Sequence, residues 1–164
     1  MIWSEILQDK IFTDYNQLAK QVLKWKIHNE KVVFTNGCFD ILHLGHIDYL
    51  SKAADLGERL IIGLNTDASV SKLKGPSRPI IDQVTRASKL ASFSYVDAVV
   101  YFGEETPLDL IKTVKPDVLV KGGDYTLQTI VGAQDVMDTG GSVEVIPFLD
   151  GHSSTSIINK IKAE

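Results

Sequence analysis

Two histidines, His43 and His46, stand three residues apart where a turn leads into a helical pattern. The apolar run Val32–Phe34 before the turn is typical of a buried strand, and the helical pattern begins near Leu44. The first turn of a helix presents unpaired N–H groups and the positive end of a dipole, which suits phosphate. Residues three apart share a helical face, and Gly45 between the histidines lets a ligand approach the backbone closely. The segment therefore predicts an anion site that can also donate protons.

The overall composition narrows the classes of protein to which this chain can belong. Its 164 residues, 44% of them apolar, suffice for one domain with a buried core. A net charge of −4 without a basic block disfavours a nucleic-acid surface. The single cysteine excludes an internal disulfide framework, no apolar run approaches the roughly 20 residues that span a bilayer, and the N-terminus does not resemble a signal peptide. We therefore expect a soluble cytoplasmic protein that binds neither nucleic acid nor membrane.

Short apolar runs alternate with helix-period segments along most of the chain. The expected buried strands are Val32–Thr35, Arg59–Leu64, Ala98–Phe102, Val118–Val120 and Val143–Pro147. The expected helices are His46–Ala54, Asp82–Phe93, Pro107–Val114, Thr129–Thr139 and Ser154–Lys162. Repeated β–α units predict an α/β fold with a parallel sheet and helices on both faces. Ligands bind beyond the carboxyl ends of such strands, where the histidine turn also lies.

Two segments stand outside this alternation. Asp14–His28 predicts an extra helix that packs on the sheet or on a second subunit, and its apolar face carries Leu18, Val22 and Trp25. We take residues 1–30 as an N-terminal helical extension of a core at 31–164, within one domain. The segment Thr66–Ile80 contains a glycine and two prolines and is expected to be a mobile loop.

The string that carries the histidines has the form G-x-F-D-x-x-H-x-G-H. An isolated histidine pair is more often a surface or core feature than a ligand site. The whole string, however, resembles the signature of the nucleotidyltransferase superfamily of cytidylyl- and adenylyltransferases. The resemblance implies a Rossmann-like three-layer α/β/α sandwich. It implies nucleotide contacts from the string itself, at Thr35, Asn36, Gly37, Cys38, Phe39, His43 and His46. Cys38 is expected to be a small filler rather than a nucleophile.

Basic residues after the second strand could neutralise a triphosphate. Lys72 and Lys74 lie in the expected loop, although loop lysines are also ordinary solvated surface. Arg86 matches a short acid-then-arginine pattern of the superfamily, but the acid is absent from the preceding Gln83–Thr85. This absence weakens the assignment of a supporting partner to Arg86, which could also be an ordinary helix-surface arginine. The resemblance implies catalytic roles for these three residues together with His43 and His46.

Two later motifs could complete a nucleotide site. The turn Lys121–Tyr125 holds two glycines at a strand end, where backbone can approach a ligand closely or a plain turn can form. The run Gly151–Ser156 precedes the last helix, where hydroxyls and N–H groups can form a second phosphate site or simply cap the helix. By resemblance, the nucleotide-binding residues here are Gly122, Gly123, Asp124, Ser153, Ser154 and Thr155.

Three residues are expected to contact the second substrate. They are Asp40, Asp67 and Lys121. Asp40 could alternatively orient a histidine, help to hold Mg²⁺ or cap the turn, and we favour an orienting or substrate-contact role over metal ligation. No metal ligand is predicted among the protein residues.

Within the superfamily the motifs resemble the adenylyltransferase domain of heptose-activating enzymes. The matching segments are Thr35–Gly37, Phe39–His43, Asn65, Lys72–Gly75, Ser77–Pro79, Thr106–Pro107 and Lys121–Tyr125. The resemblance implies transfer of AMP from ATP to a sugar 1-phosphate, with Mg²⁺ held mainly by ATP phosphates. The acceptor expected is D-glycero-D-manno-heptose 1-phosphate, and the products are ADP-heptose and pyrophosphate. It also implies a homodimer, and a sugar kinase and a phosphatase as separate partners in the pathway.

Other functions remain open on sequence grounds. A glycerol-phosphate cytidylyltransferase is the nearest alternative, although Lys121–Gly123 replaces the G-D-D form expected there. A non-catalytic nucleotide sensor would keep the same pocket, and the missing acid before Arg86 leaves room for it. A redox Rossmann protein is disfavoured because no G-x-G-x-x-G follows the first strand. The shared motifs do not identify the sugar.

Overall fold

Six parallel strands form the central sheet of the computed structural model, which describes residues 2–164. The strands are β1 (Ile11–Phe12), β2 (Val32–Gly37), β3 (Arg59–Asn65), β4 (Ala98–Phe102), β5 (Val118–Gly122) and β6 (Ser142–Ile146). Their order across the sheet is β1-β4-β3-β2-β5-β6, and every neighbouring pair is parallel. The predicted parallel sheet is confirmed, and each predicted strand is present within two residues of its expected ends.

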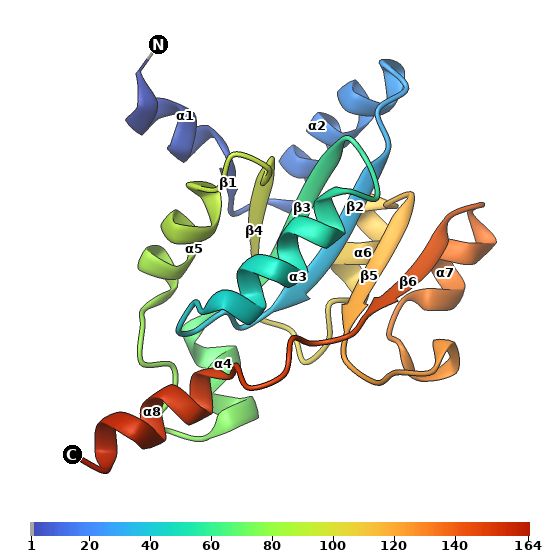
Figure 1. Cartoon of the computed structure of the whole chain (residues 1–164). Helices are drawn as coiled ribbons and strands as arrows, with labels where there is room; N and C mark the ends of the chain where they lie inside the picture. The colour runs from blue at the N-terminus through green and yellow to red at the C-terminus, as the bar shows by residue number, and fades with distance from the viewer. Residues whose placement is uncertain (1) are drawn as a thin grey trace.

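Helices cover both faces of this sheet (Figure 1). They are α1 (Trp3–Asp9), α2 (Tyr15–Ile27), α3 (Leu44–Ala54), α4 (Asp67–Lys74), α5 (Gln83–Ala91), α6 (Leu108–Val114), α7 (Ala133–Asp138) and α8 (Ser154–Lys162), with a 3₁₀ turn η1 (Leu127–Thr129). One apolar cluster joins the sheet to α2, α6 and α7, and the other joins it to α3 and α5. Successive strand residues alternate between the clusters, as Val33 and Phe34 do, because strand side chains point to opposite faces. The three-layer Rossmann-like sandwich is confirmed.

The N-terminal segment is joined to the sheet more closely than a helical extension would be. Three side chains of α2, those of Leu18, Val22 and Trp25, are buried in the cluster on one face. The two-residue strand β1 precedes α2 in the sequence and pairs with β4 at the edge of the sheet. We did not predict β1, because two residues are too few to show a periodic pattern.

The expectation of a mobile loop at Thr66–Ile80 is wrong in its first half. Residues 67–74 form α4, whose first turn is capped by the Thr66 side chain, which accepts from the N–H of Ser69 at 3.3 Å. Only the part after Gly75 is irregular, because Gly75 has a φ of 101° that ends the helix. The helix expected at Thr129–Thr139 is also shorter and begins at Ala133, after Gly132 with a φ of 81°.

The order of the strands reverses at β2. From β2 the chain continues through β3 to β4 on one side, and it then crosses back to β5 and β6 on the other side of β2. A crevice forms at such a switch point, beyond the carboxyl ends of the strands. Figure 1 shows α4 and α8 at this edge of the sheet. Among residues 2–164, none of the helices combines the length and apolarity required to cross a membrane.

Candidate active site

A pocket of about 340 Å³ lies at the ends of β2 and β5, and we call it the histidine pocket. Its walls come from the turn after β2, the start of α3, the end of α4, the end of β5 and the start of α8. The lining residues are Asn36, Gly37, Cys38, Phe39, Asp40, Gly45, His46, Tyr49, Lys74, Lys121, Gly122, Tyr125, Phe148 and Ser154. Motifs far apart in the sequence thus meet at the predicted edge of the sheet.

The two histidines of the turn stack on each other at the start of α3. Their ring centroids are 3.8 Å apart, at an interplanar angle of 26°. Nδ1 of His46 accepts from the backbone N–H of His43 at 3.3 Å, so the neutral ring carries its proton on Nε2. Burial, followed by the charges of His43 and Lys74, lowers the pKa of His46 to about 4. At neutral pH the ligand-free pocket therefore holds His46 as a neutral hydrogen-bond donor rather than as a cation.

The turn between β2 and α3 is shaped by Phe39, which adopts a φ of 47°. Its buried ring meets His46 edge-on at 5.4 Å, and a Cβ on Gly37 would lie 2.9 Å from the Phe39 ring. Gly37 therefore lets the phenyl ring fold back beneath the histidine. Burial raises the pKa of the Cys38 thiol, which favours the protonated form of a filler residue over a thiolate nucleophile.

Thr35 does not reach the histidine pocket with its side chain. It is fully buried, and its Oγ1 lies 2.6 Å from the Tyr49 hydroxyl, which also donates to the carbonyl of Val120. The predicted nucleotide contact by the Thr35 side chain is corrected to a bond that joins β2, α3 and β5 under the pocket floor.

Asp40 requires a correction as well, because its carboxylate is engaged by the protein. The side chain has no exposed surface, and its two oxygens accept from the N–H groups of Ile80 and Ile81 and from Nε of Arg78, at 2.7–3.0 Å. Burial alone would raise the pKa of Asp40, but these donors outweigh it and hold that pKa below its usual value. Asp40 therefore fixes residues 78–81 against the histidine turn, and its carboxylate does not face a substrate.

Arg86 lies inside the protein rather than in the pocket. Its side chain is 0% exposed, and its guanidinium donates to the carbonyls of Ile81, Cys38 and Asn65 at 2.7–2.9 Å. It also donates to the carboxylate of Asp67 at 2.7 Å, so its acidic partner comes from outside the preceding turn, where the family pattern places it. The direct catalytic role of Arg86 is corrected to a supporting role in one clamp with Asp67. The Asp67 side chain keeps 42% of its surface exposed, so its substrate contact stays a prediction. This clamp ties the ends of β2 and β3 to the segment before α5.

The two lysines of α4 point to different places. Lys74, at the end of the helix, borders the histidine pocket. Lys72 is exposed and lines a separate hollow beside Glu104 and Glu105. The structure therefore brings only Lys74 to the histidines, and the predicted catalytic role of Lys72 is not supported by its position.

At the end of β5, the predicted glycines lie under an aromatic ring that we did not predict. A Cβ on Gly122 would be 2.5 Å from the ring of Phe148, and Gly123 has a φ of 99° and also contacts that ring. The glycines thus give Phe148 room to lie over the strand end. Asp124 is exposed and lines a different hollow, which it shares with Phe148 and Asp150. Phe148 follows a strand, and its sequence position alone does not show that it crosses over β5.

The start of α8 closes the histidine pocket. Ser153 caps the helix by accepting from the N–H of Ser156 at 3.0 Å, and Ser154 donates to the carbonyl of Ile41 at 2.9 Å. Ser154 lines the pocket, whereas Thr155 is exposed outside it. His152 was not predicted as a site residue, yet the centroid of its ring lies 6.3 Å from that of His43 at an interplanar angle of 21°.

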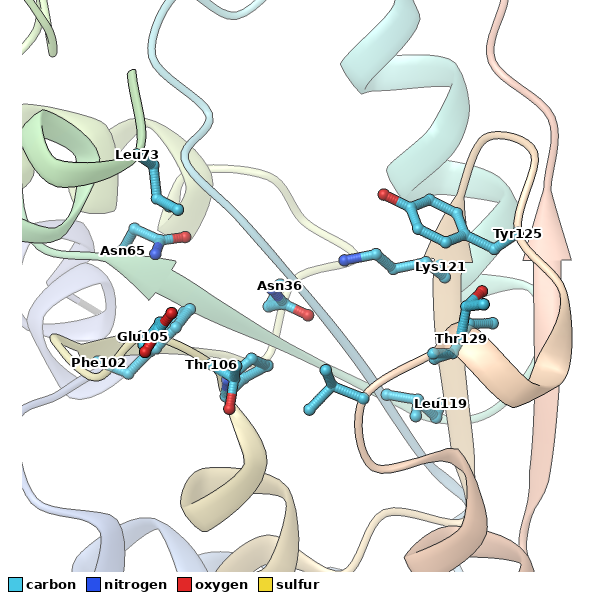
Figure 2. A pocket seen from close by; sticks show the side chains of 13 residues that line it. Asn36, Asn65, Leu73, Phe102, Glu105, Thr106, Leu119, Lys121, Tyr125 and Thr129 are labelled. Atoms are coloured by element: carbon cyan, nitrogen blue, oxygen red, sulfur yellow. The ribbon is translucent and has the colours of Figure 1, made fainter. Parts of the chain in front are cut away.

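A second pocket, of about 290 Å³, adjoins the histidine pocket (Figure 2). Both are lined by Asn36, Lys121 and Tyr125, so these residues stand between them. The second pocket extends over the ends of β3 and β4 to Glu105, and α4 contributes Leu73. The predicted substrate residue Lys121 thus reaches both spaces.

Comparisons with known proteins give consistent matches. The family described as cytidylyltransferase-like matches residues 34–160. The chain is 58% identical over 130 residues to Bifunctional protein HldE of Syntrophotalea carbinolica, covering 79% of this chain and 26% of that protein. It is 48% identical to Bifunctional protein HldE of Koribacter versatilis, covering 94% of this chain and 32% of that protein. The chain therefore spans about a quarter to a third of the length of these relatives.

Two solved structures are similar to the computed one. The first is the lipopolysaccharide core biosynthesis protein from Thermoplasma volcanium, with a TM-score of 0.58 and 28% identity, covering 73% of this chain and 97% of that chain. The second is pantoate-beta-alanine ligase from Francisella tularensis, with a TM-score of 0.60 and 17% identity, covering 94% of this chain and 78% of that chain. At 17% identity, the similarity to the second structure shows a shared fold only.

Proposed function

The chain belongs to the cytidylyltransferase-like family, and from this premise we propose that it transfers AMP from ATP to a sugar 1-phosphate. The acceptor that we favour is D-glycero-D-manno-heptose 1-phosphate, which would give ADP-heptose and pyrophosphate. The resemblance of the motifs to heptose-activating enzymes supports this choice. The similarity to a lipopolysaccharide core biosynthesis protein also supports this acceptor. The curated relatives are much longer than this chain, so the acceptor is a proposal. Such a reaction would place the protein in the cytoplasm, where ATP is available.

The proposed chemistry is a direct displacement at phosphorus. An oxygen of the sugar phosphate attacks the α-phosphorus of ATP, and the bond from that phosphorus to the oxygen bridging to the β-phosphate breaks. Pyrophosphate leaves with the electron pair. The attacking oxygen is already anionic at neutral pH, so no general base is required. Catalysis then depends on positioning and on stabilising charge in the transition state.

The pocket residues suit these two tasks. His46 directs a neutral Nε2–H donor into the pocket, where it would bond to an α-phosphate oxygen as negative charge moves. Lys74 supplies a cation from the end of α4. Ser154, whose hydroxyl donates to the carbonyl of Ile41, fixes the start of α8 at the pocket wall. Asp40 and Arg86 act behind these groups by fixing the loops that carry them.

Mg²⁺ would enter the site together with ATP. Hard cations of this kind prefer oxygen ligands and are often held mainly by substrate phosphates, where they neutralise charge. Each Asp40 oxygen already accepts two N–H bonds, so this carboxylate does not offer a vacant ligand position. In residues 2–164 no group of three His, Cys, Asp or Glu side chains is arranged to hold a metal. The chain's own residues therefore fit a metal that is carried by the nucleotide.

The observation that carries the proposal is the meeting of His46, Lys74 and Ser154 around one pocket at the switch point of the sheet. The decisive experiment is a panel of sugar 1-phosphates and glycerol 3-phosphate, each with ATP–Mg²⁺ or CTP–Mg²⁺, scored by pyrophosphate release. We expect release with ATP and heptose 1-phosphate. Release with CTP and glycerol 3-phosphate instead would identify the alternative cytidylyltransferase.

Nucleotide binding is measured separately by thermal unfolding. ATP–Mg²⁺ should raise the unfolding temperature, because a ligand that binds only the native state stabilises it. Stabilisation by ATP without turnover of any acceptor would support a nucleotide sensor and contradict the proposed enzyme.

A further inference from the structure

The second pocket has opposite charges at its two ends. Lys121 borders it where it meets the histidine pocket, and Glu105 borders it on the opposite side. Figure 2 shows the Lys121 ammonium reaching from β5 toward the middle of the pocket, with Glu105 and Asn65 across from it. A ligand that spans this pocket would therefore meet a cation at one end and an anion at the other.

Uncharged hydrogen-bonding groups lie between these charges. Asn65 is almost fully buried, and its Nδ2 donates to Ser69 Oγ at 2.7 Å, while its amide oxygen points toward the pocket (Figure 2). Thr106 adds a hydroxyl from the start of α6, and Thr129 adds from η1 a hydroxyl that donates to the carbonyl of Thr126 and leaves its oxygen as an acceptor. Amide and hydroxyl groups of this kind both donate to and accept from alcohols. The middle of the pocket therefore suits a ligand that is rich in hydroxyls.

The Lys121 end suits a phosphate. The Lys121 ammonium lies 5.3 Å from the centroid of the Tyr125 ring, which holds it at the boundary between the two pockets. Burial lowers the pKa of Lys121, so the charged form lacks part of its hydration and gains from an anionic ligand. An acceptor phosphate bound here would lie next to the space that we assign to the triphosphate.

Glu105 differs from its neighbour Glu104 in being free to face a ligand. Glu104 accepts from the Tyr15 hydroxyl at 2.8 Å and from the N–H of Gly103 at 3.1 Å. Glu104 is absent from the lining of the second pocket, which includes Glu105. Glu104 and Glu105 thus carry the same charge, but only Glu105 lines the second pocket. Glu104 is therefore a matched control for Glu105.

We propose, on the basis of the proposed function, that the second pocket binds the acceptor with its phosphate at Lys121, and that Glu105 is a specificity-determining residue. The Glu105 carboxylate accepts from distal hydroxyls of the acceptor and repels an acceptor that carries a second phosphate at its far end. The selectivity arises from charge repulsion. It therefore depends on the sign of the charge at position 105 and weakens as the ionic strength rises.

The test compares two acceptors that differ only at the far end. Pyrophosphate release with ATP–Mg²⁺ is measured for heptose 1-phosphate and for the corresponding 1,7-bisphosphate, and kcat/KM is obtained for each. We expect the wild type to prefer the monophosphate by about tenfold, the size of a like-charge interaction across a partly hydrated pocket. Glu105→Gln should narrow this preference several-fold, and Glu105→Lys should favour the bisphosphate. Raising the salt concentration should weaken the wild-type preference and leave that of Glu105→Gln nearly unchanged.

Glu104→Gln is the matched control and should keep the wild-type preference. An equal preference in the wild type and Glu105→Gln, with both enzymes active on the monophosphate, would overturn the role of Glu105 and leave the proposed function intact. Absence of pyrophosphate release from the wild type with both acceptors would instead refute the proposed function, and the inference about Glu105 with it. Thermal unfolding of each variant separates a change of specificity from a loss of folded protein.

Discussion

The turn at residues 35–46 and the segment at residues 65–86 both follow central strands, yet they use their polar side chains differently. The turn presents His46 to the histidine pocket as a neutral donor. In the second segment, Arg86 binds the Asp67 carboxylate and backbone carbonyls, and only Lys74 reaches the histidine pocket. The side chains that suit a phosphate are thus divided between ligand contact and support, and hydrogen bonds to the protein itself distinguish the supporting groups.

The largest effect is expected when the side chain of His46, which faces the histidine pocket, is removed. His46→Ala should lower kcat by about 10²–10³-fold, because it removes a preorganised donor at the position where charge develops. The fold should persist, since His46 is a partly exposed residue in the first turn of α3. Steady-state pyrophosphate release measures the loss. His28→Ala, which changes an exposed histidine at the end of α2, is the control and should keep full activity.

Removing the supporting arginine, Arg86, should reduce the stability of the fold more than it reduces the catalytic rate. Arg86→Met leaves three carbonyls, one buried and two partly buried, without this donor, and we expect a loss of about 3 kcal/mol in the free energy of unfolding. Urea denaturation gives this value. Lys89→Met, on the exposed side of the same helix, should change stability by less than about 0.5 kcal/mol. A fully stable Arg86→Met protein with impaired turnover would show instead that Arg86 contacts the substrate.

The two lysines of α4 allow a comparison within one helix between a side chain that borders the histidine pocket and one that does not. Lys74→Ala should reduce kcat/KM by about tenfold or more, because it removes a cation that borders the histidine pocket. Lys72→Ala should change kcat/KM by less than about twofold, because Lys72 lines a different hollow. Equal losses in the two variants, measured under the same conditions, would mean that the end of α4 rearranges when nucleotide binds.

The smallest expected effect is a pH dependence of the ligand-free protein. The pKa of His46 is lowered to about 4 in the folded state, so between roughly pH 6.5 and 4 the unfolded chain binds more protons than the folded protein. Stability contributed by neutral His46 is thus present above pH 6.5 and is lost as the pH falls toward 4. We expect a contribution of about 1 kcal/mol, less than the full pKa shift implies because the ring is partly exposed. His46→Gln should flatten the curve in this window, and an unchanged curve would contradict the burial argument.

The scaffold of the site could be predicted from the sequence because periodic burial determines it. The runs at Val32–Phe34 and Ala98–Phe102 are apolar throughout, and central parallel strands bury both faces. The strand β1 could not be predicted, because Ile11 and Phe12 become a strand only by pairing with β4. The helix α4 was missed because the later glycine and prolines dominated the pattern, although Thr66 and Asp67 are typical of a helix start.

Site residues were harder to predict than strands because a motif fixes residue types but not the direction of each side chain. Arg86 and Lys74 have equal charge, and only their tertiary surroundings place the first in the interior and the second at the pocket. The partner of Arg86 was sought in the preceding turn of its own helix, whereas Asp67 is the first residue of another helix, α4. Phe148 illustrates the same point, because its place over Gly122 depends on the path of the chain after β6.

The strand order has a consequence for how the chain acquires its structure. β2 pairs with β5 through Val33 and Val118, and β1 pairs with β4 through Ile11 and Val99, so two central steps of assembly join residues far apart in the chain. The entropy of closing such large loops is lost before the pairings return free energy. Refolding should therefore be slow for a protein of this length, on the order of milliseconds to seconds rather than microseconds. The walls of the histidine pocket, supplied by β2, β5 and α8, would be completed only late in that process.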